Sequence, residues 1–177
     1  EGLSIRHPAQ FVLVGSGNPE EGELRPQLQD RFGLSVDVRT PSDVPTRVEI
    51  IRSREAFDKD RSAFRKRWAR KESTLRRRIQ RAREALDSVD TPANLLETAA
   101  KLCLALGTDG LRGELTLVRS ARALAAFNNN STATLEHLKA IAPSVLRHRL
   151  RRDPLDESSA DIRVERVIAE LFNDCDD

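Results

Sequence analysis

The sequence predicts a mixed α/β chain that is mostly α-helical, in which the end of an α/β domain is followed by a helical bundle. Two short strand-like runs, residues 11–14 and residues 35–39, flank a helical stripe near the start. From residue 41 onward, apolar side chains recur every three or four positions, which is the period of an α-helix. No apolar run approaches the roughly 20 residues that a membrane-spanning helix needs, so we expect no membrane insertion.

Residues 1–40 are predicted to form strand, helix and strand. Residues 3–6 alternate apolar and polar side chains, as in one arm of a hairpin. Residues 11–14 are continuously apolar, which is typical of a strand buried on both faces of a parallel sheet. Residues 35–39 alternate again. Because forty residues cannot close a sheet of their own, we interpret them as the tail of a larger α/β domain.

The helix between the two strands is predicted from its apolar side chains at every fourth position over residues 24–32. Gly33 lies where a helix C-cap would fall. The unit carries one polar side chain at each end, Asn18 in the turn after the strand and Arg31 near the end of the helix. Nucleotide hydrolases hold a water-orienting amide and a charge-stabilising arginine in this way.

The rest of the chain is predicted to be helical. Residues 41–90 are expected to form linking helices, one of them strongly basic, and residues 91–177 a helical bundle domain. Six helices are expected, marked by Asp43 at a start, the stripe 75–86, Pro92 to Gly107, residues 111–127, Thr134 at a start, and the stripe 164–171. Cys103 lies among leucines and is predicted to be a buried, unreactive thiol, whereas Cys175 is predicted to be exposed.

The formal net charge is only +2, but the charges are unevenly spread. Residues 61–83 hold eleven Lys or Arg and one acid, and the chain turns acidic after residue 153. Such asymmetry can indicate nucleic acid or an acidic partner. A solvated helix face is the favoured interpretation, because Trp68 is the sole Trp and there is no Tyr to stack on bases. Nucleic-acid binding is therefore not the first expectation.

Several chemistries are absent from the sequence. No lysine follows a glycine, so there is no phosphate-cradling Gly-Lys-Ser/Thr loop. Gly15-Ser16-Gly17 is not a dinucleotide fingerprint, because position 20, where its third glycine belongs, is Glu20. The three histidines and two cysteines lack metal-ligand spacing, and we expect no metal site. This chain alone is not expected to bind ATP tightly or to hydrolyse it.

Three sequence blocks resemble the ATPase "I" subunit family of magnesium chelatase, which are AAA+ proteins. They are residues 5–33, with Phe-Val-Leu-Val-Gly-Ser-Gly-Asn-Pro-Glu-Glu-Gly-Glu-Leu-Arg-Pro-Gln-Leu and Asp-Arg-Phe-Gly; residues 109–115, Asp-Gly-Leu-Arg-Gly-Glu-Leu; and residues 148–155, His-Arg-Leu-Arg-Arg-Asp-Pro-Leu. Residues 61–92 match only loosely. Gln29 and Asn128–Asn130 also depart from the family, but none of these departures is a proposed site.

The resemblance implies roles for four residues. Asn18 resembles the sensor-1 amide that orients the attacking water, and Arg31 the arginine finger offered to ATP on a neighbouring subunit. Arg112 resembles the sensor-2 arginine that contacts ATP phosphate, and Asp30 is expected to pair across the same subunit interface. On this resemblance residues 1–40 are the end of the AAA+ core and residues 91–177 its helical lid domain. The phosphate loop and magnesium-binding acids are expected upstream of Glu1.

The resemblance also implies a function for the whole protein. It would form a homo-oligomeric ATPase ring that uses ATP and Mg²⁺ and couples hydrolysis to Mg²⁺ insertion into protoporphyrin IX, together with an AAA+ D subunit and a porphyrin-binding H subunit. Its place would be the bacterial cytoplasm or the chloroplast stroma. Two alternatives stay open: a nucleic-acid-remodelling AAA+ module that uses the basic helix, and a helical adaptor. The sequence does not distinguish chlorophyll from bacteriochlorophyll synthesis, or give the number of subunits.

Overall fold

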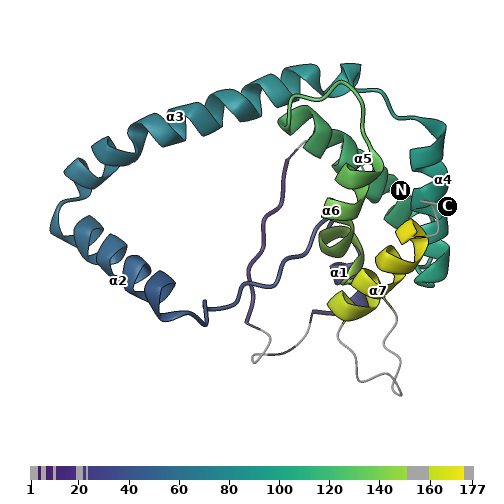
Figure 1. Cartoon of the computed structure of the whole chain (residues 1–177), viewed down its shortest axis with the longest axis horizontal. Helices are drawn as coiled ribbons and strands as arrows, with labels where there is room; N and C mark the ends of the chain where they lie inside the picture. The colour runs from purple at the N-terminus through teal and green to yellow at the C-terminus, as the bar shows by residue number, and fades with distance from the viewer. Residues whose placement is uncertain are drawn as a thin grey trace.

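The computed structural model describes residues 4, 7–9, 11–18, 22, 24–150 and 160–173. Its helices are α1 (Pro26–Gln29), α2 (Val44–Lys59), α3 (Arg61–Ala85), the short 3₁₀ helix η2 (Leu86–Ser88), α4 (Ala93–Ala105), α5 (Arg112–Phe127), α6 (Leu135–Leu146) and α7 (Ala160–Asn173). The last four α-helices gather into a bundle, and α2 and α3 project from it as a hairpin arm (Figure 1). None of these helices is long and apolar enough to cross a membrane.

The core lies in the second half of the chain. Apolar side chains from α4, α5, α6 and α7 form one buried cluster, which begins at Val89 and ends at Ile168. It includes Leu95, Leu102, Leu117, Leu138 and Val164, all at or near zero exposure. Cys103 is buried with them as predicted, and burial, aided by the negative charge of Glu114, raises the pKa of its thiol to about 11. The predicted helical stripes over residues 95–106, 138–146 and 164–171 are therefore confirmed as core-facing.

Local signals set the ends of the bundle helices. Gly107, at φ +65°, follows α4, and the Thr108 N–H donates back to the Cys103 carbonyl at 3.1 Å. This is the Schellman arrangement that ends a helix with a left-handed residue. Asn129, at φ 64°, ends α5 in the same way. Thr134 caps the start of α6 in a capping box with His137. The predicted starts and stops of these helices are confirmed.

The arm is built from two helices that share one residue at their turn. The Asp60 N–H donates to Ala56 at the end of α2, and its carboxylate accepts from the Ala63 N–H at the start of α3. At its other end, α3 packs on α5, where Arg78 donates to the Phe127 carbonyl at 2.8 Å. No described residue of α2 or α3 is buried. The apolar side predicted for these helices is covered only in part: Ala82 packs against the core, whereas Leu75 and Ile79 are exposed.

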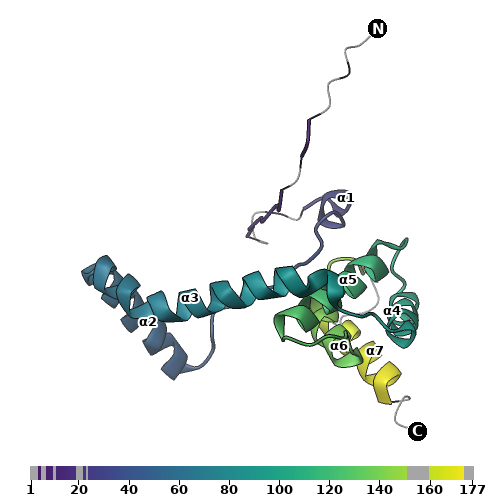
Figure 2. The ribbon, with the colours of Figure 1, turned by 90° about the horizontal axis from the view of Figure 1, so that it is seen from above.

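The predicted strands are wrong in this structure. Residues 11–14 and 35–39 are irregular, and no described residue belongs to a strand; one isolated parallel bridge joins Asp90 and Thr132. A strand needs a neighbour to pair its backbone groups, and the described chain supplies none. Phe11 to Val14 accordingly lie open to solvent, and the segment runs away from the helices (Figure 2). The mixed α/β class is not confirmed, although the mostly helical part of the prediction is.

Two further predictions near the start have different outcomes. The helix predicted over residues 24–32 is one turn, α1, which ends at Gln29, so Gly33 is not its C-cap and does not have positive φ. The hairpin arm predicted at residues 3–6 lies outside the described residues except for Ser4. Cys175 also lies outside them.

Candidate functional site

The segment that carries Arg31 is fixed against the end of α6. The Arg31 and Phe32 N–H groups donate to Leu28 and Gln29, each at 3.1 Å, which curls the chain out of α1. The Ser35 N–H then donates to Ser144 of α6 at 2.8 Å. The loop that presents Arg31 is therefore held at both ends, by α1 at residues 28–29 and by α6 at Ser35.

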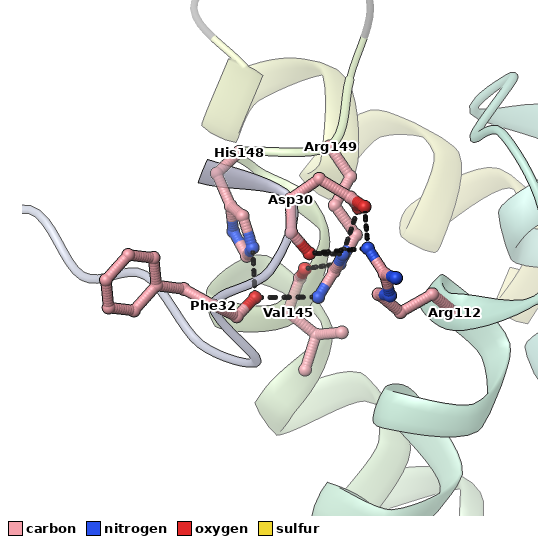
Figure 3. Close-up of polar contacts among 6 residues, drawn as sticks. All are labelled: Asp30, Phe32, Arg112, Val145, His148 and Arg149. Atoms are coloured by element: carbon pink, nitrogen blue, oxygen red, sulfur yellow. Dashed lines mark hydrogen bonds and ion pairs between the residues drawn. The ribbon is translucent and has the colours of Figure 1, made fainter. Parts of the chain in front are cut away.

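Asp30 joins this loop to the bundle through two arginines from different elements. One carboxylate oxygen accepts from Arg112 Nη1 at the first residue of α5. The other accepts from Arg149 Nη1 at 2.6 Å, just beyond the end of α6. Figure 3 shows both guanidinium groups directed at the one carboxylate. The structure thus brings together two of the predicted site residues, Asp30 and Arg112, which are 82 positions apart in the sequence.

Arg149 was not among the residues predicted for this site. Its side chain is only 3% exposed, and it donates to the Asp30 carbonyl at 2.9 Å, the Phe32 carbonyl at 2.8 Å and, through Nε, the Val145 carbonyl at 3.0 Å. A sequence signal was present, because Leu138, Ala142, Val145 and Arg149 follow one another at spacings of four, three and four. An arginine that continues a buried stripe predicts a buried, paired guanidinium.

His148 adds a second donor to the Phe32 carbonyl. Its Nε2 lies 3.0 Å from that oxygen, which can only accept, so Nε2 carries the proton. Nδ1 is then a bare, buried acceptor without a partner among the described residues. Burial is the main cause that lowers the pKa of His148, and the charges of Arg149 and Arg147 act in the same direction. His148 is therefore a neutral structural donor.

The remaining predicted residues are exposed. Arg31 is exposed and makes no side-chain ion pair or hydrogen bond with another described residue. Asn18 is also exposed, in the turn after residues 11–14. That turn lies close to the Arg31 loop, since a side-chain carbon at Gly15 would meet the Phe32 ring at 3.6 Å. Arg112 is 54% exposed, and one of its nitrogens is engaged by Asp30.

The charges of this cluster suit an anion. The Asp30 carboxylate is paired with the guanidinium groups of Arg112 and Arg149, and the next residue, Arg31, is exposed, so the positive charge of Arg31 and Arg112 is accessible to solvent. Guanidinium groups bind phosphate oxygens with charge-assisted hydrogen bonds. No group of three or more metal-ligating side chains occurs in the described part of the chain. The exposed guanidinium groups of Arg31 and Arg112 therefore offer contacts to phosphate.

Comparison with known proteins extends across nearly the whole chain. The sequence is 60% identical over 173 residues to a magnesium-chelatase 38 kDa subunit of Acidiphilium rubrum, which covers 98% of this chain and 50% of that protein. It is 61% identical to the subunit of the same name in Cereibacter sphaeroides, over 97% of this chain and 52% of that protein. Over nearly its whole length the chain is thus similar to magnesium-chelatase subunits. It spans about half the length of the curated relatives it matches.

A chloroplast relative and a domain profile also match the chain. The chain is 45% identical to the chloroplastic magnesium-chelatase subunit ChlI of Oryza sativa subsp. indica, over 97% of the chain and 41% of that protein. The profile of the AAA lid domain matches residues 96–170, which include α5 and α6. A solved structure, a putative ATPase from Cytophaga hutchinsonii, matches with a TM-score of 0.60 and 18% identity over 83% of this chain and 48% of that one. That likeness concerns the fold alone.

Proposed function

We propose that this chain is the part of a magnesium-chelatase ATPase subunit that completes the ATP site of a neighbouring subunit. In the whole protein, ATP hydrolysis would drive insertion of the substrate Mg²⁺ into protoporphyrin IX in chlorophyll or bacteriochlorophyll synthesis. The observation that carries the proposal is the cluster at Asp30, where the Arg31 loop meets Arg112 in a chain about 60% identical to magnesium-chelatase subunits. The alternatives, a nucleic-acid remodeller and a helical adaptor, are not favoured, because the match to these relatives covers 97–98% of the chain and so includes the basic helix α3.

The donor set fits the phosphates of ATP, which would be held mainly by residues outside this chain. Arg31 would act as the arginine finger, neutralising charge that spreads over the transferred phosphoryl group. Arg112 would contact phosphate as sensor 2, and its guanidinium keeps nitrogens that no described residue engages. Asn18 would orient the attacking water from its exposed turn. ATP and Mg²⁺ are thus cofactors of the whole protein, and tight binding to this chain alone is not expected.

Arg31 and Arg112 would serve the same nucleotide. Arg112 donates to the side chain of Asp30, the residue that precedes Arg31, so the backbone that carries Arg31 lies beside Arg112. If Arg31 reaches the ATP of a neighbour, Arg112 reaches that ATP as well. Asp30 would lie at that subunit interface, as the sequence predicts, while it pairs with Arg112 and Arg149 of its own chain.

The proposed partners follow from the family. The chain would work in a homo-oligomeric AAA+ ring, with the AAA+ D subunit and the porphyrin-binding H subunit of magnesium chelatase. The bacterial and chloroplastic relatives support a place in the bacterial cytoplasm or the chloroplast stroma.

The finger assignment is tested by replacing Arg31 with Ala in the whole protein. We expect ATP to bind normally but to be hydrolysed slower by about 10³-fold or more, the scale of arginine fingers in other nucleotide hydrolases. The measurement is steady-state phosphate release beside the affinity for a fluorescent ATP analogue. Arg39→Ala is the matched control, because Arg39 is exposed and pairs with Asp37 instead. Normal turnover in the Arg31 variant would sink the assignment.

A further inference from the structure

We infer that Arg149 is a positioning residue for Arg31, which it holds in place by clamping the backbone on both sides of it. The inference rests on the proposed role of Arg31 as a finger. The Arg149 side chain is only 3% exposed, so it is not accessible to a nucleotide. Its effect is therefore exerted through the loop it binds.

The contacts of Arg149 divide between an anchor and a clamp. Nε donates to the Val145 carbonyl at 3.0 Å, which fixes the guanidinium to the last turn of α6. The two terminal nitrogens point at the loop: Nη1 donates to the carbonyl and carboxylate of Asp30, and Nη2 to the Phe32 carbonyl (Figure 3). These are the residues immediately before and after Arg31. The planar fork of arginine can bridge two acceptors in this way, and the single ammonium of lysine cannot reproduce it.

The clamp leaves Arg31 itself outside the network. The backbone at Asp30 and at Phe32 is fixed, His148 strengthens the hold on the Phe32 carbonyl, and the Arg31 side chain remains exposed between them. Because the neighbours of Arg31 are tied to the bundle as well as to α1, a movement of the bundle carries the Arg31 loop with it. Arg149 thereby couples the position of the helical bundle to the position of the Arg31 side chain.

The test is directional and uses whole-length copies. A copy with Arg31→Ala is mixed with a copy that has both arginines but lacks the phosphate-loop lysine, so that hydrolysis requires the second copy to give its finger to the first. Arg149→Gln is then placed in the finger donor or in the acceptor. We expect recovery of hydrolysis to fall at least tenfold when the substitution is in the donor, and less than twofold when it is in the acceptor. Arg149→Lys should behave like Arg149→Gln, and it replaces the Gln variant in this experiment if the Gln variant does not fold.

Hydrogen–deuterium exchange gives a readout that does not depend on hydrolysis. Backbone amides of residues 28–34 should exchange faster in the Arg149 variants than in the unmodified protein. Arg147→Gln is the matched control, because Arg147 lies two residues away and pairs with Asp37 instead, and its exchange rates over residues 28–34 should not change. The inference would be overturned if hydrolysis fell equally with the substitution in the donor and in the acceptor, or fell in neither. Unchanged exchange in residues 28–34 would also overturn it. If the unmodified pair fails to recover at all, the finger proposal fails instead, and the exchange result still decides whether Arg149 holds the loop.

Discussion

The carboxylate of Asp30 is the point where the polar contacts of the site converge. It joins guanidinium groups from the start of α5 and the end of α6 to the loop that carries Arg31. Charge-assisted hydrogen bonds of this kind are the stronger class, and here one partner, Arg149, is removed from water. Breaking a buried pair on one side leaves an uncompensated charge, so these residues depend on one another.

His148 gives the site a measurable dependence on pH. Its pKa is lowered in the folded chain, by burial first, so the unfolded chain takes up a proton near pH 6.5 and the folded chain only at lower pH. The free energy of unfolding should therefore fall as the pH is lowered from 7.5 to 5.5. Asp30 acts against this shift and Arg147 and Arg149 act with it.

Urea unfolding of this chain at a series of pH values measures the effect. His148→Gln is the control, because its amide can still donate to the Phe32 carbonyl but does not titrate in this range. The unfolding free energy of the variant should change less between pH 7.5 and 5.5 than that of the unmodified chain. Equal slopes would show that His148 is not held neutral by the fold.

At the scale of helices and loops, two glycines illustrate opposite demands of the backbone. Gly107 ends α4 in the left-handed region, at φ +65°, where a side chain is strained. Gly113 lies inside the first turn of α5, and an added carbon there would meet Cys103, Thr108 and Leu146 only at 3.4–3.7 Å, which is ordinary contact. The same substitution should thus have different effects at two sites of one chain.

We expect Gly107→Ala to destabilise the bundle by about 1–2 kcal/mol, the cost of a left-handed L-residue. Gly113→Ala should be neutral or stabilising by up to about 1 kcal/mol, because alanine favours the helix. Thermal and urea unfolding of both variants give the two values. Comparable destabilisation by the two substitutions would contradict the assigned backbone conformations.

The bundle could be predicted from the sequence because its signals are local. Stripes of apolar side chains, Gly107, Asn129 and Thr134 fix where helices run and where they end within a few residues. The strands predicted at residues 11–14 and 35–39 failed because strand formation depends on a neighbour, which local pattern does not supply.

The site was predictable only in part, for the same reason. The predicted pairing of Asp30 across a subunit interface stays a prediction, and the structure adds its contacts within the chain. Arg112 and Arg149 lie 82 and 119 positions from Asp30, and no periodicity relates residues at such separations. The roles of Asn18, Arg31 and Arg112 likewise stay predictions drawn from family resemblance.

On the scale of the whole molecule, the described chain is one packed bundle with two parts that expose apolar side chains, the segment 11–38 and the arm of α2 and α3. Its accessible surface is 14500 Å², whereas a compact chain of its 19.9 kDa would expose about 8,700 Å². Every buried residue in the described chain lies at or after Val89, and most of its large exposed apolar side chains precede residue 80.

The central claim is that Arg31 and Arg112 of one subunit act together on the ATP of its neighbour. Mixing whole-length Arg31→Ala copies with Arg112→Ala copies and measuring ATP hydrolysis tests this most directly. If both arginines come from the same subunit, every site in the mixed ring that faces a variant donor lacks one of them, and activity should not rise above that of the separate variants. A mixture of either variant with copies that keep both arginines but cannot bind ATP should recover activity, which shows that mixed rings form. Recovery in the mixture of the two arginine variants would mean that Arg112 serves its own subunit's ATP, and it would contradict the account.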